Sequence, residues 1–312
     1  MNSSSVVSCC IATRIFSLKV VFLSIPSLDN KGIQWHIVAM LQEKLKLLKE
    51  KFASYGSCLV AYSGGVDSAF MALVAHQVLG DKSLAVMADS PSVPRRELED
   101  AIELARKFNI PLEIIKTHEF ENSEYLANPQ NRCYFCKYDL FSELKPVAEK
   151  HGLSVIVHGE NASDVGDFRP GIQAAAQHNI QAPLKEVGLT KPEIRELSAA
   201  MGLPTASKPQ MACLSSRIPY GEPVTPQKLS MIEAAENLLR DLGFYEVRVR
   251  HHELKLGHLA RIEVGVDELG KFYQDGLMNK VADGIKAAGY LHVTLDLQGY
   301  RRGSANEILL KK

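Results

Sequence analysis

The sequence predicts an α/β fold in which a doubly wound parallel sheet precedes a smaller C-terminal α+β domain. Three observations support this fold class. Short apolar runs alternate with amphipathic helical patterns between residues 57 and 157. A glycine turn follows the first apolar run, where a strand would lead into a helix. Prolines gather in residues 203–226, and further strand and helix patterns follow them.

The composition is that of a globular protein with a substantial core. The chain has 312 residues, 46% of them hydrophobic, and its 36 basic residues balance 36 acidic ones. This length suggests about two domains, and the balanced charge argues against a dominant nucleic-acid surface. Six cysteines are too few for a disulfide scaffold in such a chain, and no apolar run approaches the roughly 18 residues of a membrane span. We therefore expect a cytoplasmic protein with reduced thiols that binds neither nucleic acid nor a membrane.

Residues 1–39 differ from the rest of the chain. They are rich in serine, include Cys9 and Cys10, and hold one acidic residue, Asp29. A helical pattern begins at Met40, so we expect a disordered extension or a start assigned too early, with a transit peptide as the alternative. The predicted organisation is this extension, an α/β domain with its linker over 40–224, and an α+β domain over 225–312.

Strands and helices alternate through residues 40–157. The apolar runs are short enough for buried strands, and turn residues bound the helical patterns. Ligands of such sheets bind at the carboxyl ends of the strands, where the glycine turn and the segment 158–161 both lie. The predicted elements are helix 40–53, strand 57–62, helix 67–79, strand 84–88, helix 94–108, strand 112–115, helix 138–151 and strand 155–157.

Residues 203–226 contain five prolines and are predicted to form a linker. The segments beyond it mix helices and strands without regular alternation, which favours an α+β domain. The elements predicted there are helix 226–242, strands 244–250 and 260–266, a helical stretch to about 288 and strand 290–297.

The segment Ser63-Gly64-Gly65-Val66-Asp67-Ser68 is the clearest candidate for a binding site. The first N–H groups of the following helix are unpaired and carry partial positive charge, so the turn offers an anion site. The two glycines permit positive φ and let a phosphate approach the backbone, while the two serines add hydroxyl donors. Asp67 can cap the helix or hold Mg²⁺. The alternative is a surface turn that only caps a helix.

Three cysteines are candidates for chemistry. Cys133 and Cys136 form a C-x-x-C pair, which suits half a zinc site, a redox pair, two cluster ligands or simply two buried thiols. Cys213 lies in the proline-rich segment close to Arg217, and a nearby cation favours the nucleophilic thiolate over an idle loop cysteine. Cys58 lies inside the first strand and is expected to pack in the core.

Charged residues after the fourth strand form a second candidate group. Glu160, Asp164, Asp167 and Arg169 can bind a substrate or a metal ion, or belong to a solvated turn.

The strand 244–250 carries a third group. Period-two spacing puts Arg248 and Arg250 on one face, where an anion between them would relieve their repulsion. The alternative is an exposed basic face. Glu236 and Asp267 can orient these arginines or bind Mg²⁺, and His251 and His252 are expected at the surface.

Taken together, these segments resemble the LarE family of ATP-dependent sulfur transferases, which are PP-loop ATP pyrophosphatases that act in nickel-pincer cofactor synthesis. The resemblance runs from about Met40 to the end of the chain. Several separated motifs in the same order are more specific than the glycine turn alone. The matching motifs are Ser63–Ser68, Asn131–Lys137, Gly159–Asn161, Asp167–Gly171, Ala212–Gly221 and Val247–Arg250.

The resemblance implies an adenine nucleotide alpha hydrolase-like fold and a reaction. ATP and Mg²⁺ adenylate a carboxylate of pyridinium-3,5-biscarboxylic acid mononucleotide, and a cysteine sulfur then displaces AMP. Breakage of the cysteine Cβ–S bond leaves a thiocarboxylate on the product and dehydroalanine in the protein. By motif matching, Cys213 is the sulfur donor. The positions that match active-site or phosphate-binding residues are Ser216, Arg217, Glu236, Arg248, Arg250 and Asp267.

The C-x-x-C pair divides the family that the sequence resembles. In members that have it, three cysteines can hold a 4Fe–4S cluster whose open iron carries the donated sulfide. By this resemblance, Cys133, Cys136 and Cys213 are candidate cluster ligands, and Cys213 acts in both routes. The mononucleotide is then the small-molecule partner, and a homo-oligomer is expected.

Other functions stay open on the sequence alone. A second PP-loop enzyme is the runner-up, either a tRNA thiolase or an amide-forming synthetase. Neither a basic RNA-binding module nor a glutaminase-like segment is evident. The third hypothesis is a non-catalytic nucleotide and redox sensor, which would bind ATP without releasing pyrophosphate.

Overall fold

The structure is a computed structural model that describes residues 30–164, 170–210 and 212–304. It separates into two units, residues 1–40 and 41–312. Of the first unit, only the beginning of helix α1 (Asn30–Tyr55) is described. The second unit holds both sheets and all the candidate residues discussed below. Two predicted site residues, Asp167 and Arg169, lie outside the described residues.

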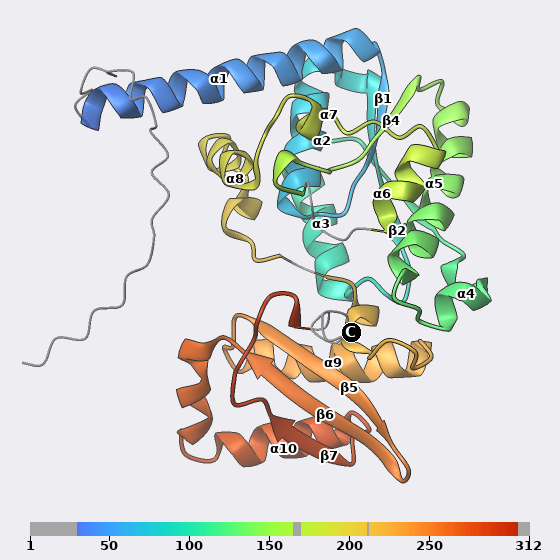
Figure 1. The fold of residues 1–312 in the computed structure, drawn as a ribbon, viewed down its shortest axis with the longest axis vertical. Helices are drawn as coiled ribbons and strands as arrows, with labels where there is room; N and C mark the ends of the chain where they lie inside the picture. The colour runs from blue at the N-terminus through green and yellow to red at the C-terminus, as the bar shows by residue number, and fades with distance from the viewer. Residues whose placement is uncertain (1–29, 165–169, 211, 305–312) are drawn as a thin grey trace, which may run out of the picture. The chain divides into compact units, whose positions relative to one another are not determined.

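A four-stranded parallel sheet forms the centre of the first half of this second unit (Figure 1). Its strands lie in the order β3-β2-β1-β4, so β1 has neighbours on both sides. The prediction of a parallel α/β sheet is confirmed, with each strand within two residues of its predicted ends. The strands are β1 (Cys58–Ala61), β2 (Ser83–Asp89), β3 (Leu112–Lys116) and β4 (Val155–Val157).

Helices cover both faces of this sheet, as in a doubly wound fold. Alternation along β1 sends Cys58 and Val60 into one hydrophobic cluster and Leu59 into another on the opposite face. The first cluster includes α2, and the second includes α5 and α6. Cys58 is fully buried, which confirms its predicted place in the core. The principal helices are α2 (Val66–Leu79), α3 (Arg95–Lys107), α5 (Arg132–Lys150), α6 (Gly171–Gln177) and α8 (Lys191–Ala200).

Short helices complete the first half of the unit. They occur where the chain turns between the longer elements, and several position residues of the site. They are η1 (Gly80–Lys82), η2 (Glu119–Glu121), α4 (Ser123–Leu126), η3 (Ala162–Asp164), α7 (Pro183–Glu186), η4 (Pro204–Ser207) and η5 (Leu214–Arg217).

The second half of the unit is built on a smaller three-stranded sheet, which confirms the predicted C-terminal α+β fold. Strands β5 (Val247–Leu254) and β6 (Gly257–Val264) form an antiparallel hairpin, and β7 (His292–Leu295) pairs with β6 in parallel (Figure 1). Helices α9 (Pro226–Asp241) and α10 (Leu277–Ala287) pack on the apolar face of this sheet, and η6 (Val266–Tyr273) connects β6 to α10. The boundary at residues 224 and 225 stays a prediction.

The hairpin corrects the prediction for His251. Strand β5 continues four residues past Arg250, so His251 lies within the sheet instead of after it. The side chain is fully buried, and its ring nitrogens lie 3.1 Å from the Tyr290 hydroxyl and 3.1 Å from Nδ1 of His258. His252 points the other way along the strand and is half-buried.

The proline-rich segment 203–226 is packed against its surroundings and is not an exposed tether. Leu203, Leu214, Ile218 and Val224 are all buried, and the last three share a hydrophobic cluster with residues of α4 and α9. Prolines therefore mark a segment with fixed turns that carries Cys213. Within the described part of the chain, none of the helices combines the length and apolar character needed to cross a bilayer.

Candidate active site

The glycine turn lies at the carboxyl end of β1, as predicted, and is closed by its two serines. The Ser63 N–H donates to Oγ of Ser68 at 3.1 Å, the two hydroxyl oxygens are 3.0 Å apart, and Ser68 Oγ donates to the Gly65 carbonyl at 3.2 Å. Gly64 has φ +68°, and a Cβ there would lie 2.5 Å from Cβ of Ala101 in α3. Gly65 has φ −79°, so of the two glycines that permit positive φ only Gly64 adopts it.

Asp67 stands in the first turn of α2 and forms an ion pair with Lys191 of α8. Lys191 thereby supplies a cation beside the turn, which itself has no lysine. Gly159, which follows β4, packs closely against the start of α2. A Cβ at this position would lie 3.2 Å from Cβ of Asp67 and 3.3 Å from the Ser68 nitrogen. The capping box of Thr190 and Glu193 marks the start of α8, and this feature of the sequence could have located Lys191 at the first position of that helix.

Cys213 lies at the same edge of the sheet as the glycine turn. The N–H of Leu214 donates to the carbonyl of Ser92 at 2.8 Å, and Ser92 follows the carboxyl end of β2. Since β2 is the direct neighbour of β1, the segment with Cys213 is fastened beside the strand end that carries the turn. The glycine turn that is predicted to bind ATP and the thiol that is predicted to donate sulfur therefore lie at the same edge of the sheet.

Arg132 contacts the sulfur of Cys213 directly, while the predicted Arg217 interacts with Cys213 through charge. Its Nη2 lies 4.0 Å from Sγ, while Nη1 donates to the Ser215 carbonyl at 2.9 Å and to Oδ1 of Asn128. Burial lowers the pKa of the Arg132 guanidinium, but the charge of Cys213 opposes this and the pKa ends above its ordinary value. Arg132 begins α5 six residues before the predicted helix start, which is why sequence reasoning missed it.

The C-x-x-C pair in the first turn of α5 faces Cys213. The pKa of the Cys136 thiol is raised first by burial, then by the charges of Cys213 and Glu119. Cys133 also interacts electrostatically with Cys213. The described residues nevertheless contain no group of three His, Cys, Asp or Glu side chains arranged to hold a metal ion. A cluster with Cys133, Cys136 and Cys213 as its ligands stays a prediction.

Arg217 and Glu236 form a fully buried pair beneath Cys213. Glu236 accepts Nε and Nη2 of Arg217 at 2.8 and 3.0 Å, Nη2 of Arg240 at 3.0 Å, and the N–H of Val249 at 3.0 Å. Burial raises the pKa of Glu236, but Arg217, Arg240 and Arg248 together outweigh it and the pKa ends below its usual range. Glu236 thus orients Arg217 and Arg240 by hydrogen bonds, and it interacts with the predicted partner Arg248 through charge.

Strand β5 places Arg248 and Arg250 on one face, and both bind the backbone of the Cys213 segment. Arg248 donates to the Gln210 carbonyl at 2.8 Å and lies 4.9 Å from the centre of the Tyr300 ring. Arg250 donates to the Ser216 carbonyl at 3.1 Å and to Oε2 of Glu263 at 2.8 and 3.0 Å. Glu263 was missed, although its place across the hairpin follows from the strand register.

The remaining predicted residues are more scattered. Asp267 is exposed in η6, and its role stays a prediction. Glu160 is buried beside Lys185 Nζ at 2.7 Å and His158 at 3.4 Å, so it does not belong to a solvated turn. Burial, with Lys137 and Lys185, lowers the pKa of His158 to about 4. Asp164 is also buried and accepts the N–H of Asn161 at 3.1 Å.

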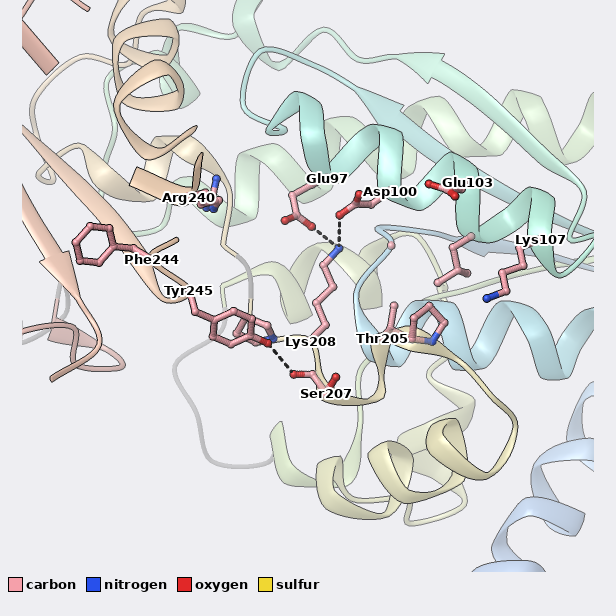
Figure 2. A pocket seen from close by; sticks show the side chains of 14 residues that line it. Glu97, Asp100, Glu103, Lys107, Thr205, Ser207, Lys208, Arg240, Phe244 and Tyr245 are labelled. Carbon is pink, nitrogen blue, oxygen red and sulfur yellow. Dashed lines mark hydrogen bonds and ion pairs between the residues drawn. The ribbon is translucent and has the colours of Figure 1, made fainter. Parts of the chain in front are cut away.

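A cavity of about 690 Å³ borders the glycine turn on the side of α3. Figure 2 shows Lys208 at its centre, reaching from the segment after η4 toward Glu97 and Asp100 of α3. The Tyr245 hydroxyl closes one side by donating to the Ser207 carbonyl at 3.3 Å. Gly64 is part of the wall, so a ligand held at the turn can extend into this space. Sequence reasoning missed Lys208, which immediately precedes Pro209.

Comparison with known proteins agrees with this geometry. Residues 34–131, which contain the glycine turn, match the NAD synthase family. The pyridinium-3,5-bisthiocarboxylic acid mononucleotide synthase of Lactiplantibacillus plantarum is 32% identical over 81% of this chain and 90% of its own length. An uncharacterized protein of Synechocystis is 44% identical over 87% of this chain and all of its own length. An uncharacterized protein of Methanocaldococcus jannaschii is 29% identical over 85% of this chain and 99% of its own length. The glycine turn, the Cys213 segment and this similarity over most of both chains together establish that the protein belongs to the LarE family of PP-loop, ATP-using proteins.

Proposed function

We propose that this protein is an ATP-dependent sulfur transferase that converts a carboxylate of pyridinium-3,5-biscarboxylic acid mononucleotide into a thiocarboxylate, in nickel-pincer cofactor synthesis. The observation that carries the proposal is the common edge shared by the glycine turn and Cys213. A hydrogen bond from Leu214 to Ser92 fastens the thiol beside the end of β2, next to the strand that leads into the turn. The activity for which the Lactiplantibacillus plantarum relative is named supports this substrate.

In the first step, the turn binds the phosphates of Mg·ATP. The unpaired N–H groups at the start of α2 and the hydroxyls of Ser63 and Ser68 are donors for phosphate oxygens. Asp67, in the first turn of α2, is the candidate ligand of the Mg²⁺ that enters with ATP. A substrate carboxylate attacks the α-phosphate, so pyrophosphate leaves and an acyl-adenylate forms. The carboxylate oxygen by itself is a poor leaving group. Joined to AMP, it becomes a good one.

In the second step, the sulfur of Cys213 attacks the activated carbonyl and AMP leaves. The guanidinium of Arg132 lies 4.0 Å from Sγ and places a positive charge beside the attacking sulfur. The product is a thioester between the substrate and Cys213. Breakage of the Cβ–S bond then releases the thiocarboxylate and leaves dehydroalanine at position 213. A sulfide carried on a cluster is the alternative sulfur source, and no step of this route depends on it.

Intact-mass measurement after anaerobic turnover tests this proposal. The wild-type chain should lose one H₂S, mapped to residue 213, for each thiocarboxylate formed. Cys213→Ser should still release pyrophosphate from ATP but form no thiocarboxylate. Cys58→Ala is the matched control, since it removes a thiol from the core and leaves the site intact.

Three outcomes would contradict the proposal. Many products per chain at unchanged mass would point to a renewable sulfur source. Pyrophosphate release with an amide product would indicate a synthetase. A flat pyrophosphate baseline with the mononucleotide present would favour a nucleotide sensor. We also propose that the protein is cytoplasmic and that it forms a homo-oligomer. Light scattering of the purified protein would test the oligomeric state.

A further inference from the structure

The elimination step requires more than a thiol. After acyl transfer, a base must remove the proton on Cα of Cys213. The C–H electron pair then forms the Cα=Cβ bond, the Cβ–S bond breaks, and the sulfur leaves with its electrons as the thiocarboxylate. A Cα proton in a peptide is weakly acidic, because its removal pushes negative charge onto the carbonyl oxygen of the same residue. Donors aimed at this oxygen would lower the barrier.

The carbonyl oxygen of Cys213 has such donors. It accepts the N–H of Ser216 at 3.0 Å, the Ser216 hydroxyl at 2.8 Å and Nη1 of Arg217 at 2.9 Å. The first is the backbone bond of a tight 3₁₀ turn, and the second comes from a side chain of the same turn. The third is different, because it brings a full positive charge to a backbone oxygen.

Arg217 is held firmly in this position. Its side chain is buried, and two hydrogen bonds to Glu236 leave Nη1 directed at the backbone carbonyls of Ala212 and Cys213. Buried donors that are already oriented stabilise developing charge better than mobile ones, since they need no rearrangement during the reaction. Ser216 and Arg217, the two residues matched to nucleotide binding, therefore both direct donors at the Cys213 carbonyl.

Glu119 is a candidate for the base. It is 3% exposed, and its Oε2 has no hydrogen-bond partner among the described residues. Its Oε1 accepts only a long hydrogen bond, 3.4 Å, from the hydroxyl of Ser92. The carbonyl of the same Ser92 binds the N–H of Leu214, and the Cys136 thiol is influenced by the charges of both Cys213 and Glu119. A buried carboxylate oxygen without a partner is costly, which makes Oε2 of Glu119 a candidate for a functional group.

We propose that the site contains its own elimination machinery, in which Ser216 and Arg217 stabilise the charge that develops on the Cys213 carbonyl oxygen and Glu119 accepts the Cα proton. This inference rests on the proposed function, because it explains that reaction's second half. Glu119 ends the step as a carboxylic acid, and the proton then returns to water. No oxidant or reductant is needed.

The test separates acyl transfer from elimination. Glu119→Gln keeps the shape of the side chain but removes the base. It should release pyrophosphate at close to the wild-type rate and accumulate a thioester on Cys213, seen as a gain in intact mass that hydroxylamine reverses. Dehydroalanine formation should slow by about a hundredfold or more. Glu121→Gln is the matched control, because Glu121 is 77% exposed and lies two residues along the chain.

Ser216→Ala tests the other half of the proposal. It removes one donor from the carbonyl oxygen and should slow dehydroalanine formation about tenfold or more, with a smaller effect on pyrophosphate release. The proposal is wrong if Glu119→Gln forms dehydroalanine at the wild-type rate. It is also wrong if both half-reactions fall together, which a purely structural role predicts. A wild-type protein that releases no pyrophosphate would instead contradict the proposed function, and this inference with it.

Discussion

Arg132 brings a buried positive charge to within 4.0 Å of the sulfur of Cys213. We expect Arg132→Met, which keeps the length but removes the charge, to slow alkylation of Cys213 by iodoacetamide about tenfold at pH 7.5. Peptide mass spectrometry would follow the modification over time. Arg132→Lys should have a smaller effect because it retains the charge.

Cys58 reports whether the variant is folded in the same experiment. It is fully buried, so it stays unmodified while the core is intact. Equal alkylation rates for the wild type and Arg132→Met, with Cys58 protected in both, would contradict the role given to this arginine.

Individual side chains were predictable only where the local sequence determined their surroundings. The core position of Cys58 follows from the apolar run around it. The burial of His251 does not, because it depends on a hairpin turn four residues farther on. Arg132 and Glu263 owe their roles to contacts with residues 81 and 13 positions away. No short window of sequence contains that information.

The turn between β1 and α2 shows how one element constrains a residue. Gly64→Ala places a Cβ 2.5 Å from Ala101 in a backbone with positive φ. We expect it to lower the free energy of unfolding by about 2–3 kcal/mol, and to weaken ATP binding. Urea denaturation and calorimetry would measure the two effects.

Gly56, at the other end of β1, is the matched control for this substitution. It has φ +72° and open space around its missing Cβ. Gly56→Ala therefore incurs backbone strain alone, about 1 kcal/mol. Equal losses of stability in the two variants would show that contact with α3 does not matter.

At the level of elements, strands were easier to predict than helices. The four parallel strands are short apolar runs between turn residues, a pattern that few other structures share. The first turn of α5 was missed because aromatic residues and cysteines interrupt its periodicity, and α6, α7 and α8 were missed because they are short. The capping box at Thr190 would have revealed α8.

Buried histidines in both halves of the second unit make its stability depend on pH. Burial lowers the pKa of His251 to about 4, with a further effect of His258, and the pKa of His158 is likewise about 4. Since the ordinary value is about 6.5, the unfolded chain binds more protons than the folded one between pH 6.5 and 4. Stability should therefore fall as the pH drops through this window, by an amount on the order of 2 kcal/mol for each histidine.

Urea unfolding at pH 7.5 and pH 4.5 would measure this loss. His251→Gln, which retains a hydrogen-bonding side chain but does not titrate, should be less stable at pH 7.5 yet lose less on acidification. If His251→Gln loses as much stability between pH 7.5 and pH 4.5 as the wild type does, then His251 does not contribute to the pH dependence.

The order of the strands and the assembly of the site become visible only in the whole molecule. The presence of two sheets followed from the pattern of elements, but the order β3-β2-β1-β4 depends on how each crossover packs. That order makes β1 and β2 neighbours and brings residues 63–68, 92 and 213 to one edge. The site is thus assembled from segments separated by well over a hundred residues, each held by contacts with the others.

Three donors bind the backbone carbonyl oxygen of Cys213, and none of these three hydrogen bonds involves the sulfur. On the proposed route, a chain that has given up its sulfur carries dehydroalanine at position 213, and it would keep these hydrogen bonds and remain folded. Such exhausted molecules would persist alongside fresh ones and compete with them for the mononucleotide. The yield of cofactor would then track how quickly the cell synthesises this protein and clears its used copies, more than how fast any single copy works.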